Sequence, residues 1–205
     1  MKSIKAPCIQ TRIFYLNIME IWLTAGRDFK LRHWDISKPG GHVLQTISIH
    51  SDEITDCVEI VNPRCIATCS LDRTIVMFDL EHREIIRTID NAHEKGIRKI
   101  RYQNCNGAQM MTLGNECYAN LWAPESLVSD IHIGKLKGHK KPIIDGQYLG
   151  RAPYIVTIDS NNVINFYDIQ TLEAVQQLVF QSQVVPEGLI ALNNTTFWTY
   201  GKRMV

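Results

Sequence analysis

Short apolar segments rich in β-branched and aromatic residues alternate along this chain with turns that contain Gly, Pro, Asn and Asp. No stretch of useful length has helical periodicity, so the pattern predicts strands throughout. The predicted strands fall into sets of four. These sets are 8–16, 20–26, 31–36 and 43–49; 54–60, 65–70, 74–80 and 84–89; 97–103, 109–114, 118–122 and 131–136; and 143–149, 154–158, 163–169 and 172–180. A fifth set begins with strands 189–192 and 196–200.

A threonine, an acidic or polar residue four places later and an aromatic ring ten places later recur with a regular period. The first copy is Thr24, Asp28 and Trp34. Later copies are Thr68, Asp72 and Phe78; Thr112, Glu116 and Trp122; Thr157, Asn161 and Tyr167; and an opening Thr199. Successive threonines are 44, 44, 45 and 42 residues apart. Four short strands in such a period predict an all-β protein built of stacked blades, as in a β-propeller.

These repeats resemble the WD40 family over nearly the whole chain, from residue 8 to residue 205. Trp34-Asp35 is a full WD dipeptide, and Gly138-His139 is a full GH dipeptide. The resemblance implies a WD40 β-propeller segment spanning residues 1–205, with four complete four-stranded blades and part of a fifth. The expected blades cover about 8–49, 54–90, 97–136 and 143–180, with a partial blade at 184–205.

In this family a His, a Ser or Thr, an Asp and a Trp share one buried hydrogen-bond network in each blade. The resemblance assigns to it His50, Thr68, Asp72 and Phe78 in blade two; His93, Thr112, Glu116 and Trp122 in blade three; His139, Thr157, Asn161 and Tyr167 in blade four; and Thr24, Asp28 and Trp34 in blade one. Blade one has Ala6 at the His position, and Asn161 lacks a charge to hold His139. Nucleophilic catalysis could also use His, Thr and Asp. Imperfect copies at one period favour a structural role, so no catalytic residue is predicted.

Partner proteins of this family usually bind to loops on one rim of the propeller. The matching positions are Arg27, Glu53, Thr55, Leu71, Arg98, Asn115, Ile144 and Ser160. We expect Leu71 and Ile144 to be exposed apolar residues beside Arg27 and Arg98, a mixture that suits a protein interface. Alternatively, these residues only fill turns.

The composition of the chain narrows the classes of partner that it is expected to bind. The net charge of +1 offers no whole-chain attraction to nucleic acid or anionic lipid. A short basic run, made by Lys135, Lys137, Lys140 and Lys141, is either a solvated turn or a contact for an acidic or phosphate group. The six cysteines are expected to be free thiols, and without a second Cys/His pair at ligand spacing no metal or other cofactor is expected. No uninterrupted apolar run suits a membrane span, and no signal peptide is recognised.

Segments such as CSLDRTIVMFDL and HEKGIRKIRY resemble long WD40 proteins of ciliated and flagellated cells, some of which carry EF-hands. This chain has no Asp-x-Asp-x-Asp-Gly calcium loop. The expected function is a non-catalytic, cytoplasmic scaffold for other proteins, in a ciliary or cytoskeletal assembly. The alternative is a substrate-recognition subunit of an enzyme complex such as a ubiquitin ligase. That role is disfavoured because the positions that carry Arg or Lys in cullin receptors hold Ser37, Glu81, Glu125 and Gln170.

Complete WD40 rings typically have seven blades, which at this period would need roughly 300 residues. The sequence is therefore expected to be a segment of a longer protein, an incomplete gene product or a half-ring that a partner completes. An open blade edge would invite pairing with another chain.

Overall fold

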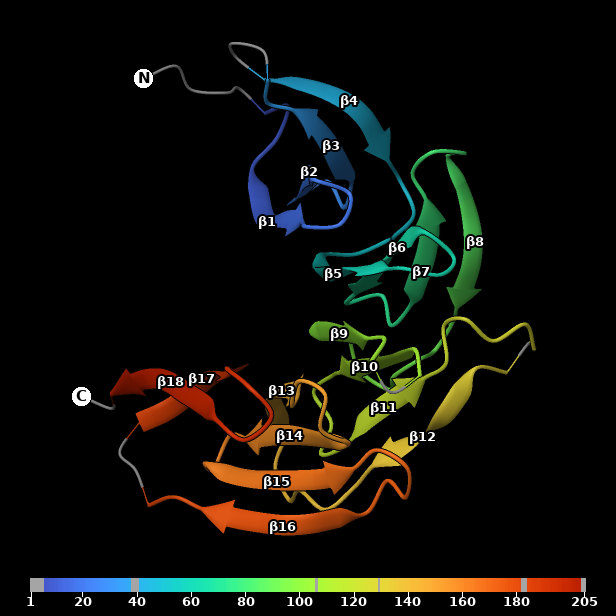
Figure 1. The fold of residues 1–205 in the computed structure, drawn as a ribbon. Coiled ribbons are helices and arrows are strands. Elements are labelled where there is room, and N and C mark those ends of the chain that lie inside the picture. Colours follow the sequence, from blue (N-terminus) through green and yellow to red (C-terminus); the bar gives the residue numbers. More distant parts are fainter. Residues whose placement is uncertain (1–5, 38–40, 106, 129, 182–183, 204–205) are drawn as a thin grey trace. The chain divides into compact units, whose positions relative to one another are not determined.

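The computed structural model describes residues 6–37, 41–105, 107–128, 130–181 and 184–203. In these ranges all regular structure is β (Figure 1), and none of the described residues forms a helix that could cross a membrane. Contacts divide the chain into two compact units, Met1–Arg98 and Lys99–Val205. Each unit is described by itself.

The first unit holds two antiparallel sheets of four strands, each in simple up-and-down order. The first sheet consists of β1 (Gln10–Leu16), β2 (Ile21–Gly26), β3 (Leu31–Asp35) and β4 (His42–Ile47). The second consists of β5 (Ile54–Ile60), β6 (Cys65–Ser70), β7 (Ile75–Asp79) and β8 (Glu84–Ile89). One buried apolar cluster, which includes Leu23, Leu31, Ile54 and Phe78, joins the two sheets.

The second unit repeats this arrangement. One sheet consists of β9 (Lys99–Gln103), β10 (Gln109–Leu113), β11 (Ala119–Trp122) and β12 (His132–Leu136), and the next of β13 (Ile143–Tyr148), β14 (Tyr154–Asp159), β15 (Val163–Asp168) and β16 (Ala174–Val179). A two-stranded sheet follows, made by β17 (Val184–Ala191) and β18 (Phe197–Arg203). Met111, Leu121, Ile155 and Tyr167 belong to the buried cluster between the first two sheets.

The recurring aromatic residue coincides with a register shift in the backbone pairing of each four-stranded sheet. In all four four-stranded sheets the pairing of the third strand with the fourth shifts register at the step into this residue: at Trp34, Phe78, Trp122 and Tyr167. Such a bulge bends the strand and increases its local twist. The repeated sequence therefore produces a repeated distortion, and the blades are copies in geometry as well as in order.

The prediction of an all-β fold with four four-stranded blades and part of a fifth is confirmed for the described residues. The largest difference lies in the partial blade, where β17 begins five residues earlier than the predicted 189–192. The register of β17 shifts between Pro186 and Gly188, so Glu187 is the bulged residue and the proline lies directly beside the bulge, where a missing N–H is tolerated. Whether all the blades belong to one ring stays a prediction.

Candidate functional site

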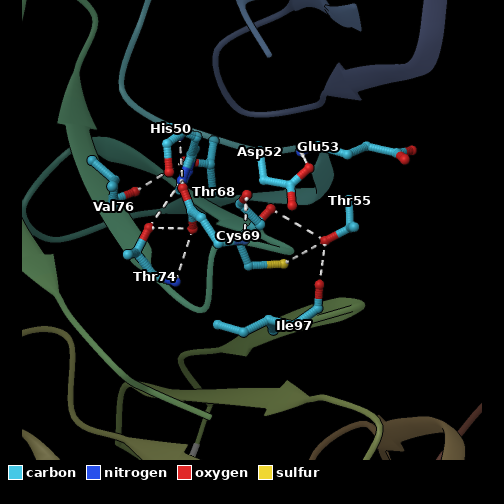
Figure 2. A network of polar contacts seen from close by, with 12 residues as sticks. His50, Asp52, Glu53, Thr55, Thr68, Cys69, Thr74, Val76 and Ile97 are labelled. Carbon is cyan, nitrogen blue, oxygen red and sulfur yellow. Dashed lines mark hydrogen bonds and ion pairs between the residues drawn. The ribbon is translucent and has the colours of Figure 1, made fainter. Parts of the chain in front are cut away.

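Blade two contains the predicted polar network (Figure 2). The imidazole of His50 is fully buried. Its Nδ1 lies 3.0 Å from Asp72 Oδ2, and its Nε2 lies 2.9 Å from Thr68 Oγ1. With Asp72 ionised, Nδ1 carries the proton and Nε2 accepts the Thr68 hydroxyl. Because Phe78 has no indole N–H, the second neighbour of Thr68 Oγ1 is the Val76 carbonyl, at 3.3 Å.

Asp72 is held by more than the imidazole. It accepts the backbone N–H groups of Ser51 and Thr74, each at 2.9 Å, and the Thr74 hydroxyl at 2.7 Å. Burial alone would raise the pKa of Asp72, but these hydrogen bonds together lower it. Burial lowers the pKa of His50, and the nearby Asp72 offsets this only in part. The pair is therefore a neutral imidazole beside a carboxylate, which suits a structural link between the start of β5 and the β6–β7 turn.

Blade four has the same network with a different acid. His139 Nε2 lies 2.6 Å from Thr157 Oγ1, while His139 Nδ1 lies 3.0 Å from Asp159 Oδ2. The sequence analysis placed the uncharged Asn161 at the acid position of this blade and expected no carboxylate to hold His139, and this was wrong because Asp159 is the acid. Asn161 instead donates its backbone N–H to Asp159 Oδ1 at 2.8 Å, as Val163 does at 3.1 Å. Strand β14 runs on to Asp159, so the last strand residue supplies the carboxylate that the turn supplies in blade two.

Blade one replaces the histidine with an amide. The indole of Trp34 donates to Thr24 Oγ1 at 2.8 Å, and the Thr24 hydroxyl donates to Gln10 Oε1 at 2.6 Å. Sequence reasoning looked for the equivalent of His at Ala6 and missed Gln10. The available signal was a polar side chain on the strand that pairs with the strand of Thr24.

Asp28, the expected acid of blade one, has a different partner from the other acids. Both of its carboxylate oxygens bond to the guanidinium of Arg32, which is 3% exposed, and Cys8 Sγ lies 3.1 Å from Oδ1. The Arg32 hydrogen bonds lower the pKa of Asp28. The sequence analysis did not single out Arg32. A buried guanidinium bound by two oxygens is a structural ion pair rather than a free anion site.

In blade three the Trp122 indole donates to Thr112 Oγ1 at 2.8 Å, and Glu116 is buried. His93 is also buried, but it belongs to the first unit and the other three residues belong to the second. The link from His93 to them stays a prediction.

The rim residues differ in exposure. Arg27 and Arg98 are exposed, whereas Leu71 and Ile144 are half-buried rather than exposed. Glu53, Asn115 and Ser160 are half-buried as well. Neither Arg27 nor Arg98 has an ion pair among the residues that the structure describes.

Thr55 does not belong to an accessible rim. It is only 9% exposed, and its hydroxyl donates to the Ile97 carbonyl at 2.7 Å, with the Cys69 carbonyl at 3.2 Å (Figure 2). The reason is local: the β5–β6 register shifts between Ile54 and Asp56, which makes Thr55 the bulged residue. A bulge re-aims a side chain, and here the hydroxyl satisfies backbone carbonyls.

Three rim positions of the first unit come together. The Leu71 N–H donates to the Glu53 carbonyl at 3.0 Å, and Leu71 covers Gly96, where an added Cβ would lie 2.8 Å from the Leu71 Cα. The Ile97 N–H donates to the Ser70 carbonyl at 3.0 Å, which places Arg98 close to this group. In the second unit, Ile143 and Ser160 make matching backbone bonds to Glu116 and Pro142, at 3.1 Å each. The candidate rim is thus a backbone-linked set of turns in each unit.

Asp145 on β13 was not singled out from the sequence, although it is 1% exposed. Its oxygens lie 2.8 Å from Lys99 Nζ and 3.1 Å from Arg101 Nη2, and they accept the Leu189 N–H at 3.0 Å. This carboxylate therefore links the three sheets of the second unit. The one charged residue of a mostly buried strand was the signal that could have identified it.

The structure carries six free cysteines. Across the described ranges, no group of three or more His, Cys, Asp or Glu side chains could hold a metal ion.

Comparison with known proteins gives one family match. Residues 41–79 match the family model of the WD domain, G-beta repeat. The matched stretch contains β4 to β7, and with them His50, Thr68 and Asp72 of the blade-two network. No curated protein matches the chain.

Proposed function

From the WD40 repeat that this chain carries, we propose a non-catalytic scaffold that docks other proteins through the rim loops of its blades. WD40 domains are typically non-catalytic interaction modules. The observation that carries the proposal is that two groups of polar residues differ in burial and in bonding. The His, Thr and Asp side chains that could do chemistry are bound to one another inside the blades. Arg27 and Arg98, by contrast, are exposed between strands and have no ion pair in the described part of the chain.

The rim has the composition of an interface. Arginine is enriched in the residues that dominate binding energy, and a neighbouring half-buried apolar side chain can supply contact area. Arg98 and Leu71 provide this combination in the first unit. We place the scaffold in the cytoplasm, in a ciliary or other cytoskeletal assembly, on the resemblance of its repeats to proteins of ciliated and flagellated cells.

The test is proximity labelling in cells with the wild-type chain and the variant Leu71→Glu/Arg98→Glu. We expect the variant to lose labelled partners while its melting temperature stays within a few degrees of the wild-type value. Arg64→Glu is the matched control, because Arg64 is an exposed turn arginine of the same unit that lies just before β6, at the other end of that strand from Leu71. An unchanged set of labelled proteins in the double variant would refute the proposal.

A further inference from the structure

A groove of about 660 Å³ lies within the first unit, between the outer strand of one sheet and the third and fourth strands of the next. Residues 44–49, from β4 and the segment after it, form one wall, and Phe78, Arg83 and Ile85 form the other. None of the predicted rim residues lines it. The groove is therefore a surface separate from the proposed docking rim.

The β4 wall is a free strand edge. β4 is the outer strand of its sheet (Figure 1), and β3 is its pairing partner within the described ranges. An edge strand presents unpaired N–H and C=O groups that can pair with another extended chain. Natural edges are usually blunted by charge or proline, but residues 44–49 read Leu-Gln-Thr-Ile-Ser-Ile and contain neither. This edge is chemically suited to accept a strand.

The side chains around the groove would select the side chains of an incoming strand, in addition to its extended backbone. Leu44 and Ile85 are 53% and 51% exposed, one on each wall, while Ile47 and Phe78 are buried. An apolar side chain entering between the walls would cover both exposed residues.

Arg83 is the single charged residue of the groove lining. It has no ion pair among the residues the structure describes. The acidic residues Asp79 and Glu81 of the same turn line a different hollow, together with His33 and Arg64. The groove therefore offers one unpaired positive charge beside apolar contact area.

We propose that this groove binds an extended segment of a partner protein, which pairs with the edge of β4, inserts an apolar side chain between Leu44 and Ile85 and places a carboxylate at Arg83. Strand addition obtains affinity from main-chain bonds and specificity from alternate side chains. The partner segment is thus an alternating β-forming stretch with one acidic residue. This inference goes beyond the rim proposal, and either can fail without the other.

The probe is a panel of fluorescein-labelled octapeptides of alternating Thr and Val or Ile, in which one Asp is moved along the sequence. Fluorescence anisotropy on the full chain at low salt measures binding. We expect one Asp register to bind best, its Lys counterpart to bind about five- to tenfold more weakly, and a central Pro, which removes a backbone donor, to abolish binding. Arg83→Glu should reverse the preference of Asp over Lys.

Arg73→Glu is the control for this test, since Arg73, like Arg83, is an exposed turn arginine with positive φ, 71° against 58°. It should bind the panel as the wild type does. The inference is overturned if no peptide binds, if Asp and Lys peptides bind the wild type equally, or if Arg83→Glu leaves the preference unchanged. A concentration-dependent dimer that Arg83→Glu disrupts would also overturn it, because the occupant would then be a second copy of this chain.

Discussion

Replacing Asp159 with alanine is the sharpest test of how the blades are held together. The carboxylate is 1% exposed, and it receives bonds from His139 Nδ1 at 3.0 Å, Asn161 N at 2.8 Å and Val163 N at 3.1 Å. Its removal leaves the imidazole donor buried without an acceptor and removes the acceptor of two backbone amides. We therefore expect Asp159→Ala to destabilise blade four.

The magnitude follows from these bonds. A buried donor without a partner costs about 1–3 kcal/mol, and each lost neutral hydrogen bond about 0.5–1.5 kcal/mol. Asn161 is exposed and Val163 is half-buried, so water can replace part of the loss at their amides. The expected decrease in the free energy of unfolding is about 2–4 kcal/mol, near the upper end of ordinary single substitutions.

Hydrogen–deuterium exchange on the full chain is the assay, read on peptides that cover β14 and β15, because it reports local opening free energies. Asn161→Ala is the matched control: the Asn161 bond to Asp159 comes from the backbone, so this variant should stay within about 0.5 kcal/mol of the wild type. The reasoning fails if Asp159→Ala exchanges like the wild type. It also fails if Asn161→Ala costs as much as Asp159→Ala.

Three further outcomes are expected. Burial lowers the pKa of His50 and His139, so the unfolded chain binds more protons than the native chain as pH falls below about 6.5. The melting temperature should therefore drop below this pH, and it should drop less steeply in the variant His50→Gln/His139→Gln. Burial raises the pKa of Cys65 to about 12 and also that of Cys57, so iodoacetamide at pH 8 should label exposed Cys105 and spare these two, a result that equal labelling by mass spectrometry would contradict. Gln10→Ala removes the acceptor of Thr24 and should lower stability by about 1 kcal/mol, whereas an unchanged urea midpoint would exclude that role.

The period of the threonines predicted the strands well because strand order, turn positions and side-chain alternation are all local properties of a repeat. The period also predicted the hydrogen bonds between Trp and Thr, because Trp34 and Trp122 reach Thr24 and Thr112 from fixed register positions. The acid was less predictable. Two positions can carry it: blade two uses the turn residue Asp72, with Ser70 two places before, and blade four uses the last strand residue Asp159, with Asn161 two places after.

Other contacts depend on strand pairing and bulges, which the spacing of residues in the sequence does not predict. Gln10 reaches Thr24 because β1 pairs with β2, and Thr55 is turned inward by a bulge. The exposed apolar edge of β4 could be read from the sequence as a strand, but its neighbour across the groove, Ile85, comes from the next blade. Sequence periodicity thus predicts the blades, and the structure is needed to show which side chains meet between them.

The central claim is that the polar networks hold the blades together while the rim binds partners. It is tested most directly by measuring the melting temperature and the set of proximity-labelled proteins for two variants of the full chain. Leu71→Glu/Arg98→Glu should lose partners and keep its melting temperature, whereas His50→Ala should lose stability through its buried partners Thr68 and Asp72. A rim variant that keeps every partner, or a His50→Ala variant that melts like the wild type, would contradict the claim.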